Sequence, residues 1–342
     1  MIEIKHNVSL RSFNTFGVDA IAKYFVEVNS RKDLLLLFDN PIYKQEKHFI
    51  LGSGANVLFS SNFDGIIIKS DIKGIEIIEG NDEFGLISVG SGVIWNDFVN
   101  FAVEHSFSGV ENLIDIPSQC GSAVVQNIGA YGMEVCESVE KVFAVEMSGE
   151  NNEIIFGNQD CNFSYRNSIF KEKRNIGKYY ITKILFKLRK SFIPCLNYKE
   201  LTEKFAGKNG REVIIKDICN AISEIRSNKL PDYKTYGNAG SFFKNPVVKY
   251  SRYKELIEKD SLVIYKVQGN DDLVKLSAAQ LIELSGLKGY SKGNVGVSEK
   301  HSLVLCNLGG ASGQEIVDFS NTIIEAVNRK FDVLLEPEVI IV

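Results

Sequence analysis

The sequence predicts an α+β protein with two or three domains, and three observations lead to this expectation. Its 342 residues, 44% of them hydrophobic, are enough to build more than one buried core. In the first part of the chain, short runs rich in β-branched residues and bounded by glycine or aspartate alternate with helical patterns. Near residue 210 the pattern changes to amphipathic helices, which indicates a further domain.

The expected elements of the first part are short. A helix over 32–38 follows a cap region at Asn29–Ser30, and strands are expected over 48–51, 65–69 and 86–89. The next helix is amphipathic, with apolar residues at the i, i+3, i+4, i+7 and i+8 positions. These residues are Trp95, Phe98, Val99, Ala102 and Val103. The stretch 106–132 is rich in glycine and proline and is expected to be mostly loop.

The second part contains further strands and then helices. Strands of an antiparallel or mixed sheet are expected over 139–146, 153–156 and 180–188. Three isoleucines, at 218, 222 and 225, indicate a helix that stops before Pro231, and a helix over 276–284 is expected to end at Gly286. A capping box from Ser312 to Glu315 opens a long helix, and 333–342 is expected to be a strand interrupted by Pro337.

Composition excludes several classes of protein. The net charge is −4 without a basic block, so we expect no nucleic-acid partner. No run of about eighteen apolar residues occurs, and the first residues do not resemble a secretion signal, so we expect no membrane span and a cytoplasmic location. The six cysteines are scattered without metal-binding spacing, which predicts reduced thiols and no metal site.

Two glycine-containing stretches could hold a phosphate or a flat ligand. Gly52-Ser53-Gly54-Ala55-Asn56 follows an expected strand, and its glycines allow close approach of a ligand to the backbone. It lacks the third glycine and the helix of a Rossmann fingerprint, so a purely structural turn remains an alternative. The stretch 116–132 is long and built of small residues, which is compatible with ligand binding or with an Ω-loop packed on itself.

Three polar positions could carry chemistry. Arg166 is either a surface arginine or a bidentate clamp for a carboxylate. Ser241 stands in a turn of small residues without a nearby histidine, so it could cap the turn or donate a proton, but it is not a hydrolase nucleophile. Glu336 and Glu338 are either exposed strand charges or acids that face a site.

Taken together, several segments resemble the UDP-N-acetylenolpyruvoylglucosamine reductase family over essentially the whole chain. The segments that carry this resemblance are Leu51–Asn56, Gln126–Gly132, Tyr165–Lys171 and Gly237–Pro246, between Asn14–Gly17 and Leu335–Val339. The resemblance implies an FAD-binding domain of the vanillyl-alcohol-oxidase type and an α+β substrate-binding domain. It places the first FAD-binding subdomain at 1–70 with 320–342, the second at 71–215, and the substrate domain at 216–319.

The resemblance also implies a reaction. NADPH delivers hydride to non-covalent FAD, hydride then passes to the terminal carbon of the enolpyruvyl group of UDP-N-acetylglucosamine enolpyruvate, and a proton is added at the ether-bearing carbon. The product is UDP-N-acetylmuramate, a precursor of peptidoglycan. Because FAD supplies the hydride chemistry, no strong nucleophile is needed. The expected protein is a monomer.

The site residues that the resemblance implies fall into three groups. Arg166 holds the substrate carboxylate, Glu336 is its acidic partner, and Ser241 donates the proton. Tyr198, in a substrate loop found in one branch of the family, joins Lys229 and Asn245 in binding the UDP-sugar. The expected FAD contacts are Gly52, Ser53, Gly54, Ala55, Asn56, Val57, Ser118, Gly121, Ser122, Asn127, Gly129, Ala130, Tyr131 and Arg226.

Two positions depart from the family pattern. Ala55 replaces a usual serine, and Ser118 replaces a usual glycine. If the backbone at Ser118 needs a positive φ, strain of about 1–2 kcal/mol is expected there. Two alternatives therefore stay open: an oxidase of the same flavin fold that acts on a sugar or alcohol, and a flavin-free protein that binds a nucleotide sugar.

Overall fold

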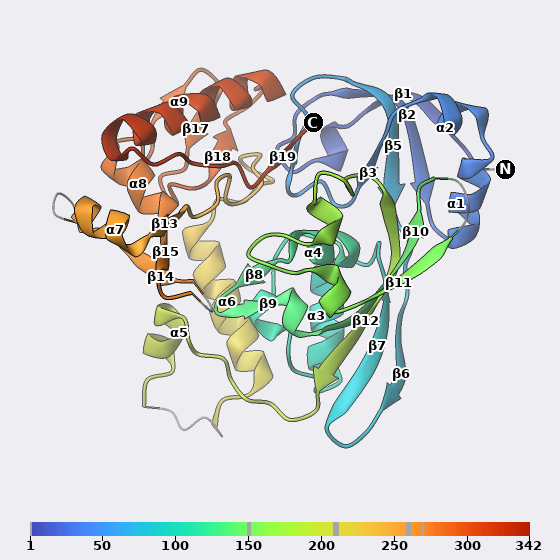
Figure 1. Cartoon of the computed structure of the whole chain (residues 1–342), viewed down its shortest axis with the longest axis horizontal. Helices are drawn as coiled ribbons and strands as arrows, with labels where there is room; N and C mark the ends of the chain where they lie inside the picture. The colour runs from blue at the N-terminus through green and yellow to red at the C-terminus, as the bar shows by residue number, and fades with distance from the viewer. Residues whose placement is uncertain (1, 149–151, 208–211, 258–260, 268–269) are drawn as a thin grey trace. The chain divides into compact units, whose positions relative to one another are not determined.

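The chain forms two compact units, each assembled from separate stretches of sequence. The computed structural model describes residues 2–148, 152–207, 212–257, 261–267 and 270–342. The first unit comprises Met1–Val8, Ala22–Ser53 and Asp64–Arg226, and the second comprises Ser9–Ile21, Gly54–Phe63 and Ser227–Val342 (Figure 1). Each unit is described by itself below.

The first unit contains a four-stranded sheet in the order β1 (Lys5–Ser9), β2 (Ile21–Val28), β5 (Phe63–Ser70) and β3 (His48–Leu51). Helices α1 (Arg31–Phe38) and α2 (Pro41–Gln45) contribute Leu34, Leu37 and Tyr43 to the core beside this sheet. Strands β3 and β5 are parallel, with Leu51 opposite Lys69. This register brings the end of β3, and the glycine turn that follows it, next to the end of β5.

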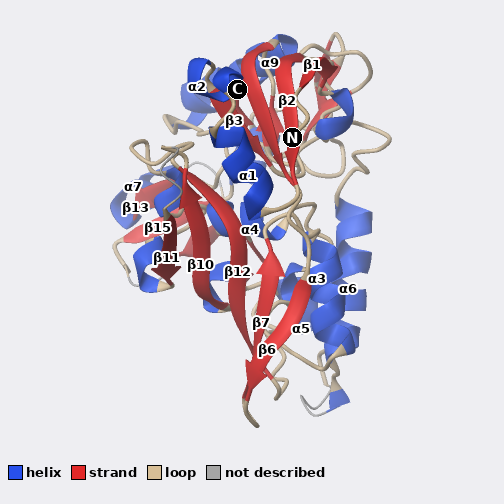
Figure 2. Ribbon diagram, turned by 90° about the vertical axis from the view of Figure 1, so that its right-hand side faces the viewer, coloured by secondary structure: helices blue, strands red, loops and turns tan. Residues whose placement is uncertain are grey.

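The first unit also contains a larger antiparallel sheet. Its order is β11 (Glu153–Gly157), β10 (Val139–Glu146), β12 (Tyr179–Arg189), β7 (Phe84–Gly90) and β6 (Ile75–Gly80) (Figure 2). Helices α3 (Trp95–Glu104) and α4 (Cys120–Gln126) pack on one face. Trp95 is fully buried there, contacts the Phe98 and Phe186 rings, and donates from Nε1 to the Leu113 carbonyl at 2.8 Å.

The remaining elements of the first unit are short or lie near its end. They are β8 (Gly129–Ala130), β9 (Met133–Glu134), α5 (Lys199–Lys204), α6 (Ile215–Lys229) and the 3-10 turns Glu111–Leu113, Val135–Glu137, Gln159–Cys161 and Ile169–Lys171. The buried stripe of α6 includes Ile218 and Ile222, as the isoleucine spacing predicts. The last residues of α6, from Ser227, belong to the second unit.

In the described residues, the second unit is built from small sheets and helices around one core. Its sheets are β13 (Val247–Lys249), β15 (Leu273–Leu276) and β14 (Ile264–Lys266); β16 (Ser291–Lys292), β17 (Val295–Val297) and β18 (Leu305–Asn307); and β19 (Ile340–Ile341) with β4 (Val57–Leu58). Its helices are α7 (Tyr250–Ile257), α8 (Ala278–Leu284) and α9 (Gly313–Phe331), and the 3-10 turn Arg11–Phe13 precedes its first core residues. Phe16 and Leu58 are buried in this core. Two short segments from early in the chain, Ser9–Ile21 and Gly54–Phe63, therefore complete it.

Most of the expected elements are confirmed. The strands over 48–51 and 139–146 agree with β3 and β10 at both ends, and the expected helix at 32–38 is α1. The capping box is present: Ser312 Oγ accepts from the Glu315 amide at 3.2 Å, and the Glu315 carboxylate accepts from the Ser312 amide at 2.8 Å. A capping box satisfies two amides that the first turn of a helix leaves without partners.

Two expectations about elements are wrong, and one is incomplete. The stretch 106–132 is mostly loop and turn, as expected, but it also contains the short helix α4. Of the expected strand 333–342, only Ile340–Ile341 is a strand, and Pro337 forms an isolated bridge with Phe243 instead. Helix α8 begins at Ala278, because Leu276 pairs with Ile264 as the last residue of β15. Among the helices in the described ranges, none combines the length and the apolar character needed to cross a bilayer.

Candidate active site

The glycine turn after β3 is held closely by neighbouring chain segments. A Cβ atom on Gly52 would lie 2.6 Å from Ser122 Oγ, so this turn packs against the first turn of α4. The next glycine, Gly54, belongs to the second unit, where it has φ +67° and a Cβ would lie 2.0 Å from the Phe13 carbonyl oxygen. Both positions therefore exclude a side chain, for steric reasons at Gly52 and for conformational reasons as well at Gly54.

Substituting Gly54 by alanine is expected to destabilise the protein more than substituting Gly17 does. Gly17 has φ +64° with nothing within 4 Å of a built Cβ, so G17A has only the left-handed strain of about 1–2 kcal/mol. G54A has the same strain and a backbone clash, which adds about 1–3 kcal/mol. Urea denaturation of both variants measures the difference, and equal midpoints would contradict the close contact with Phe13.

The rest of the glycine turn belongs to the second unit and is fixed to the last segment of the chain. Asn56 Nδ2 donates to the Glu338 carbonyl at 3.2 Å, and Val57 pairs with Ile340 in a parallel bridge. Ala55 is buried. The Asn56 side chain and the Val57 backbone thus anchor this part of the turn.

A cluster of polar side chains surrounds the first turn of α4 in the first unit. Ser118 Oγ lies 3.3 Å from Ser122 Oγ, and Lys69 Nζ donates to Gln119 Oε1 at 3.3 Å. Gly121, the next expected cofactor residue, packs closely against Ser91. A Cβ atom added to Gly121 would lie 2.9 Å from the Cβ of Ser91. Ser118 is not among the residues with positive φ, so the strain expected there does not arise.

The expected cofactor residues 127–131 form a tight turn after α4. Asn127 and Tyr131 both have left-handed backbones, at φ 46° and 50°. Asn127 is fully buried, and its Nδ2 donates to the Ser164 carbonyl at 2.9 Å and to Glu134 Oε2 at 3.0 Å. Gly129 and Ala130 then pair with β9. These contacts fix the backbone on which a ligand could lie.

Arg166 lies against this turn, in the same unit. Its Nη2 donates to the Gly129 carbonyl at 2.6 Å, and its guanidinium lies 5.2 Å from the Tyr165 ring centroid. Its own backbone is left-handed, at φ 54°, which is costly for a residue with a Cβ and occurs mainly where the surroundings impose it. Arg166 is therefore a held side chain and not a freely exposed surface arginine.

Lys171 helps to hold Arg166, which corrects an expectation from the sequence. The basic cluster Lys171, Lys173 and Arg174 suggests a solvated loop, and Lys173 and Arg174 are indeed exposed. The Lys171 Nζ, in contrast, donates to the Arg166 carbonyl at 3.0 Å and to Gln126 Oε1 at 2.6 Å.

The substrate-loop tyrosine contacts the same turn. The Tyr198 ring meets the Tyr131 ring edge-on, with centroids 4.9 Å apart. Asn112, which is fully buried and which the sequence analysis does not single out, connects the two segments: its Nδ2 donates to the Tyr131 carbonyl at 2.8 Å and to the Cys195 carbonyl at 3.0 Å. In the first unit, Arg166, Tyr131 and Tyr198 are therefore brought together.

Ser241 and Glu336 are brought onto neighbouring segments in the second unit. The Lys244 amide donates to the Glu336 carbonyl at 2.9 Å, and the Glu338 amide donates to the Phe242 carbonyl at 2.7 Å. On its other side, the segment pairs through a Ser241–Val304 bridge. The Glu336 carboxylate is exposed and lies 3.6 Å from Lys244 Nζ.

Two of the other expected site residues, Asn245 and Arg226, are hydrogen-bonded to backbone groups of the protein, and Lys229 lies in a cationic region. Asn245 Oδ1 accepts from the Ala278 amide at 3.0 Å, at the start of α8. Arg226 Nη2 donates to the Asp115 carbonyl at 3.0 Å. Lys229 lies near His301, whose pKa is lowered by burial and then by the positive charges of Lys229 and Lys288. A cationic region of the second unit therefore includes one expected residue and a histidine that the sequence analysis does not identify.

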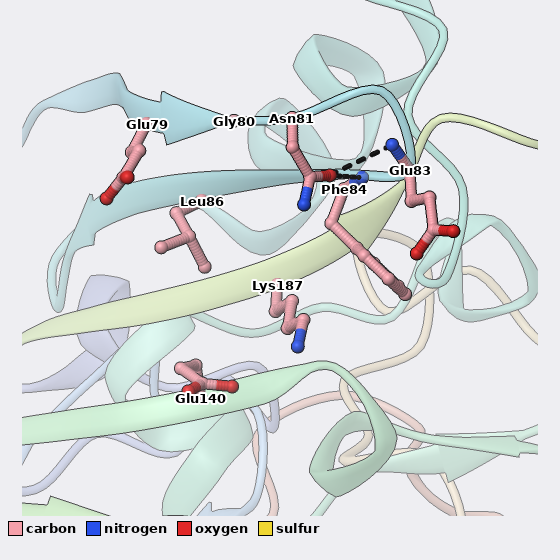
Figure 3. A pocket seen from close by; sticks show the side chains of 8 residues that line it. All are labelled: Glu79, Gly80, Asn81, Glu83, Phe84, Leu86, Glu140 and Lys187. Carbon is pink, nitrogen blue, oxygen red and sulfur yellow. Dashed lines mark hydrogen bonds between the residues drawn. The ribbon is translucent and has the colours of Figure 1, made fainter.

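One pocket is lined by none of these residues. It has a volume of about 400 Å³ and is formed by residues of β6, β7, β10, β12 and the turn between β6 and β7 (Figure 3). Its lining residues are Glu79, Gly80, Asn81, Glu83, Phe84, Leu86, Glu140 and Lys187. Three carboxylates and one ammonium make it unfavourable for an anionic nucleotide.

Family models match most of the chain. A model described as an FAD binding domain matches residues 22–153, and a model described as the C-terminal domain of UDP-N-acetylenolpyruvoylglucosamine reductase matches residues 231–342. The predicted α+β class and the FAD-binding domain are thereby confirmed.

Full-length relatives agree with these matches. UDP-N-acetylenolpyruvoylglucosamine reductase of Flavobacterium johnsoniae is 39% identical over 341 residues, 99% of both chains, and that of Amoebophilus asiaticus is 39% identical over all of both chains. The crystal structure of the Thermus caldophilus enzyme, MurB, matches the fold with a TM-score of 0.69 at 20% identity, over 100% of this chain and 99% of that one. The chain belongs to the UDP-N-acetylenolpyruvoylglucosamine reductase family of FAD-dependent oxidoreductases.

Proposed function

We propose that this protein uses NADPH to reduce the enolpyruvyl ether of UDP-N-acetylglucosamine enolpyruvate, which yields UDP-N-acetylmuramate for peptidoglycan synthesis. The observation that carries this proposal is the pairing of two segments in the second unit. There, a half-buried serine and an acidic residue stand on two segments that are hydrogen-bonded to each other: Lys244 N–H donates to the Glu336 carbonyl at 2.9 Å, three residues after Ser241. A proton donor and an acid are what the second half of this reduction needs.

The residues of the first unit fit a bound FAD. The polar cluster at α4 presents two serine hydroxyls and one ammonium, which are donors suited to a diphosphate. Bound FAD supplies the hydride chemistry, accepting hydride from NADPH and passing it to the enolpyruvyl carbon. No histidine or cysteine occurs in 51–56, so binding is proposed to be non-covalent.

Arg166 is proposed to bind the substrate carboxylate. Hydride addition builds negative charge next to this carboxylate, and donors that are held in place before the reaction stabilise such charge without reorganisation. The 2.6 Å bond to the Gly129 carbonyl and the Tyr165 ring orient the guanidinium for this role.

Ser241 is proposed to donate the proton to the ether-bearing carbon, with Glu336 as the acidic group that assists Arg166. Ser241 is half-buried, which reduces competition by water for its proton. Its backbone is fixed by the bridge to Val304, and the Lys244 ammonium lies 3.6 Å from the Glu336 carboxylate.

The UDP-sugar is proposed to contact Tyr198, Lys229 and Asn245. The charge of Lys229 suits a pyrophosphate, and the ring of Tyr198 is braced by Tyr131. The division into FAD-binding subdomains at 1–70 with 320–342 and 71–215, and a substrate domain at 216–319, stays a prediction. The monomeric state also stays a prediction. So does the cytoplasmic location, which the six free cysteines and the proposed use of NADPH support.

An anaerobic absorption experiment tests the proposal. Purified protein is expected to show flavin bands that bleach with NADPH and return when UDP-N-acetylglucosamine enolpyruvate is added. Bands that return only with oxygen, together with turnover of a simple sugar or alcohol, would support the oxidase alternative. A protein that stays colourless after FAD is supplied would support the nucleotide-sugar-binding alternative and exclude the proposed reaction.

A further inference from the structure

Lys69 lies at the point where the glycine turn, strand β5 and helix α4 meet in the first unit. It stands opposite Leu51 in the parallel β3–β5 pair, one residue before the turn begins at Gly52 on the other strand. Its Nζ donates to Gln119 Oε1 at 3.3 Å and to the Ser70 carbonyl at 3.1 Å. The ammonium is therefore fixed beside the first turn of α4.

The partners of Lys69 are neutral, although the side chain is half-buried. Within the described ranges, Lys69 has no ion pair, while the nearby Asp71 carboxylate pairs with Lys73 at 2.7 Å. Burial lowers the pKa of Lys69, because the charged ammonium loses water, and the charges of Asp71 and Glu27, which act in the opposite direction, do not offset this loss. An anionic ligand at this place would restore the lost stabilisation of the charge.

Gln119 is the residue that positions the ammonium. Gln119 is 2% exposed, and its Nε2 donates to the Ser70 carbonyl at 3.1 Å and to the Gly92 carbonyl at 3.0 Å. These two bonds leave Oε1 directed toward Lys69. A buried amide with all of these bonds is rigid, so the position of the Lys69 ammonium is built into the fold.

Other donors occupy the same place. A Cβ on Gly52 would lie 2.6 Å from Ser122 Oγ and 3.3 Å from Gln119 Oε1. The Ser118 and Ser122 hydroxyls lie 3.3 Å apart. The Gly52 backbone, the two serine hydroxyls and the Lys69 ammonium thus lie close together beside the first turn of α4.

We propose that Lys69 binds and neutralises the diphosphate of FAD, and that Gln119 positions it for this purpose. This inference rests on the proposed function, since it needs FAD as the resident cofactor. It adds a lysine to a cofactor site whose expected residues include a single cationic side chain, Arg226.

The test is the affinity of the full-length protein for FAD, measured by quenching of flavin fluorescence. K69Q keeps a polar side chain but removes the charge, and its dissociation constant is expected to rise by about 10- to 100-fold, as for loss of a hydrogen bond to a charged group. K69R is expected to restore most of the affinity. K73Q is the matched control: it removes a lysine four residues away, which pairs with Asp71, and it should leave the affinity within about twofold.

Competitors separate the diphosphate from the rest of the cofactor. ADP competing with FAD is expected to weaken in K69Q by the same factor as FAD, while adenosine is expected to compete equally well in both proteins. Equal losses for ADP and adenosine would show a distorted pocket and would overturn the inference.

The pH dependence gives a second readout that a purely structural lysine would not produce. The charged form of Lys69 binds the diphosphate, and its pKa in the FAD-free protein lies below the ordinary lysine value. FAD affinity should therefore fall as the pH rises through this lowered pKa, and the fall should disappear in K69R, since a guanidinium stays charged. An unchanged pH profile in K69R would contradict the role.

Failure of this inference differs from failure of the proposed function. A wild-type protein that does not bind FAD would remove the proposed function. A wild type that binds FAD, with K69Q indistinguishable from K73Q, would remove the role of Lys69 alone.

Discussion

Replacing Ser241 by alanine is expected to leave the bleaching of flavin absorbance by NADPH nearly unchanged and to slow its return with the enolpyruvyl substrate by about 10²–10⁴-fold. The hydroxyl is needed only where a proton reaches carbon, and the NADPH half of the cycle contains no such step. Stopped-flow absorbance under anaerobic conditions separates the two halves.

The chain offers a matched control for this variant. Ser302 belongs to the segment that pairs with the Ser241 strand, and its buried Oγ has no hydrogen-bond partner. S302A removes a hydroxyl from the same neighbourhood without removing a proton donor, so both half-reactions should keep wild-type rates. If S241A slowed both halves equally, Ser241 would be a structural residue of the turn.

Arg166→Lys is expected to lower kcat/KM for the UDP-enolpyruvyl sugar by about 10²–10³-fold, although the positive charge is kept. An ammonium cannot form two parallel bonds to a carboxylate, and a shorter reach to the Gly129 carbonyl loses the bond that orients the group. The reduction by NADPH does not involve the substrate carboxylate and is expected to change little.

The control for this variant is Arg174→Lys. Arg174 is exposed and pairs with Glu172 at 3.1 Å, in the same basic stretch of sequence. R174K should match the wild type in both half-reactions. Loss of activity in R166K that is fully explained by lower thermal stability, with unchanged kcat/KM for the folded fraction, would exclude the carboxylate clamp.

The sequence predicts the regular parts of this fold well, because their patterns are periodic. The apolar stripe of α6 can be recognised in the sequence from the spacing of isoleucines such as Ile218, and the capping box of α9 from Ser312 and the glutamate three residues later. Helix α4 is not visible, because Cys120–Gln126 consists mainly of small and β-branched residues and has no apolar period. The strand expected at 333–342 shortens to Ile340–Ile341, which pairs with β4, because the pairing around Pro337 is limited to an isolated bridge with Phe243.

The residues of the candidate site also fall into two groups, those that the sequence identifies and those that only the structure identifies. Arg166, Ser241 and Glu336 stand in motifs that the family resemblance makes recognisable, and their assigned roles stay predictions. Lys69 and Asn112 carry no local pattern, because their surroundings come from residues about 20 to 80 positions away, such as Gln119 and Cys195. The order of strands β3 and β5, and not any motif, places Lys69 beside the glycine turn.

The pairing of β4 with β19 has a consequence for how the protein is made. Val57 and Ile340 are neighbours in the folded second unit but are separated by most of the polypeptide. At synthesis rates of about 5–20 residues per second, a ribosome needs roughly 15–60 s between the two strands. Throughout that time Asn56 lacks its Glu338 acceptor, so this end of the glycine turn reaches its folded form only after the segment around Ile340 has been synthesised.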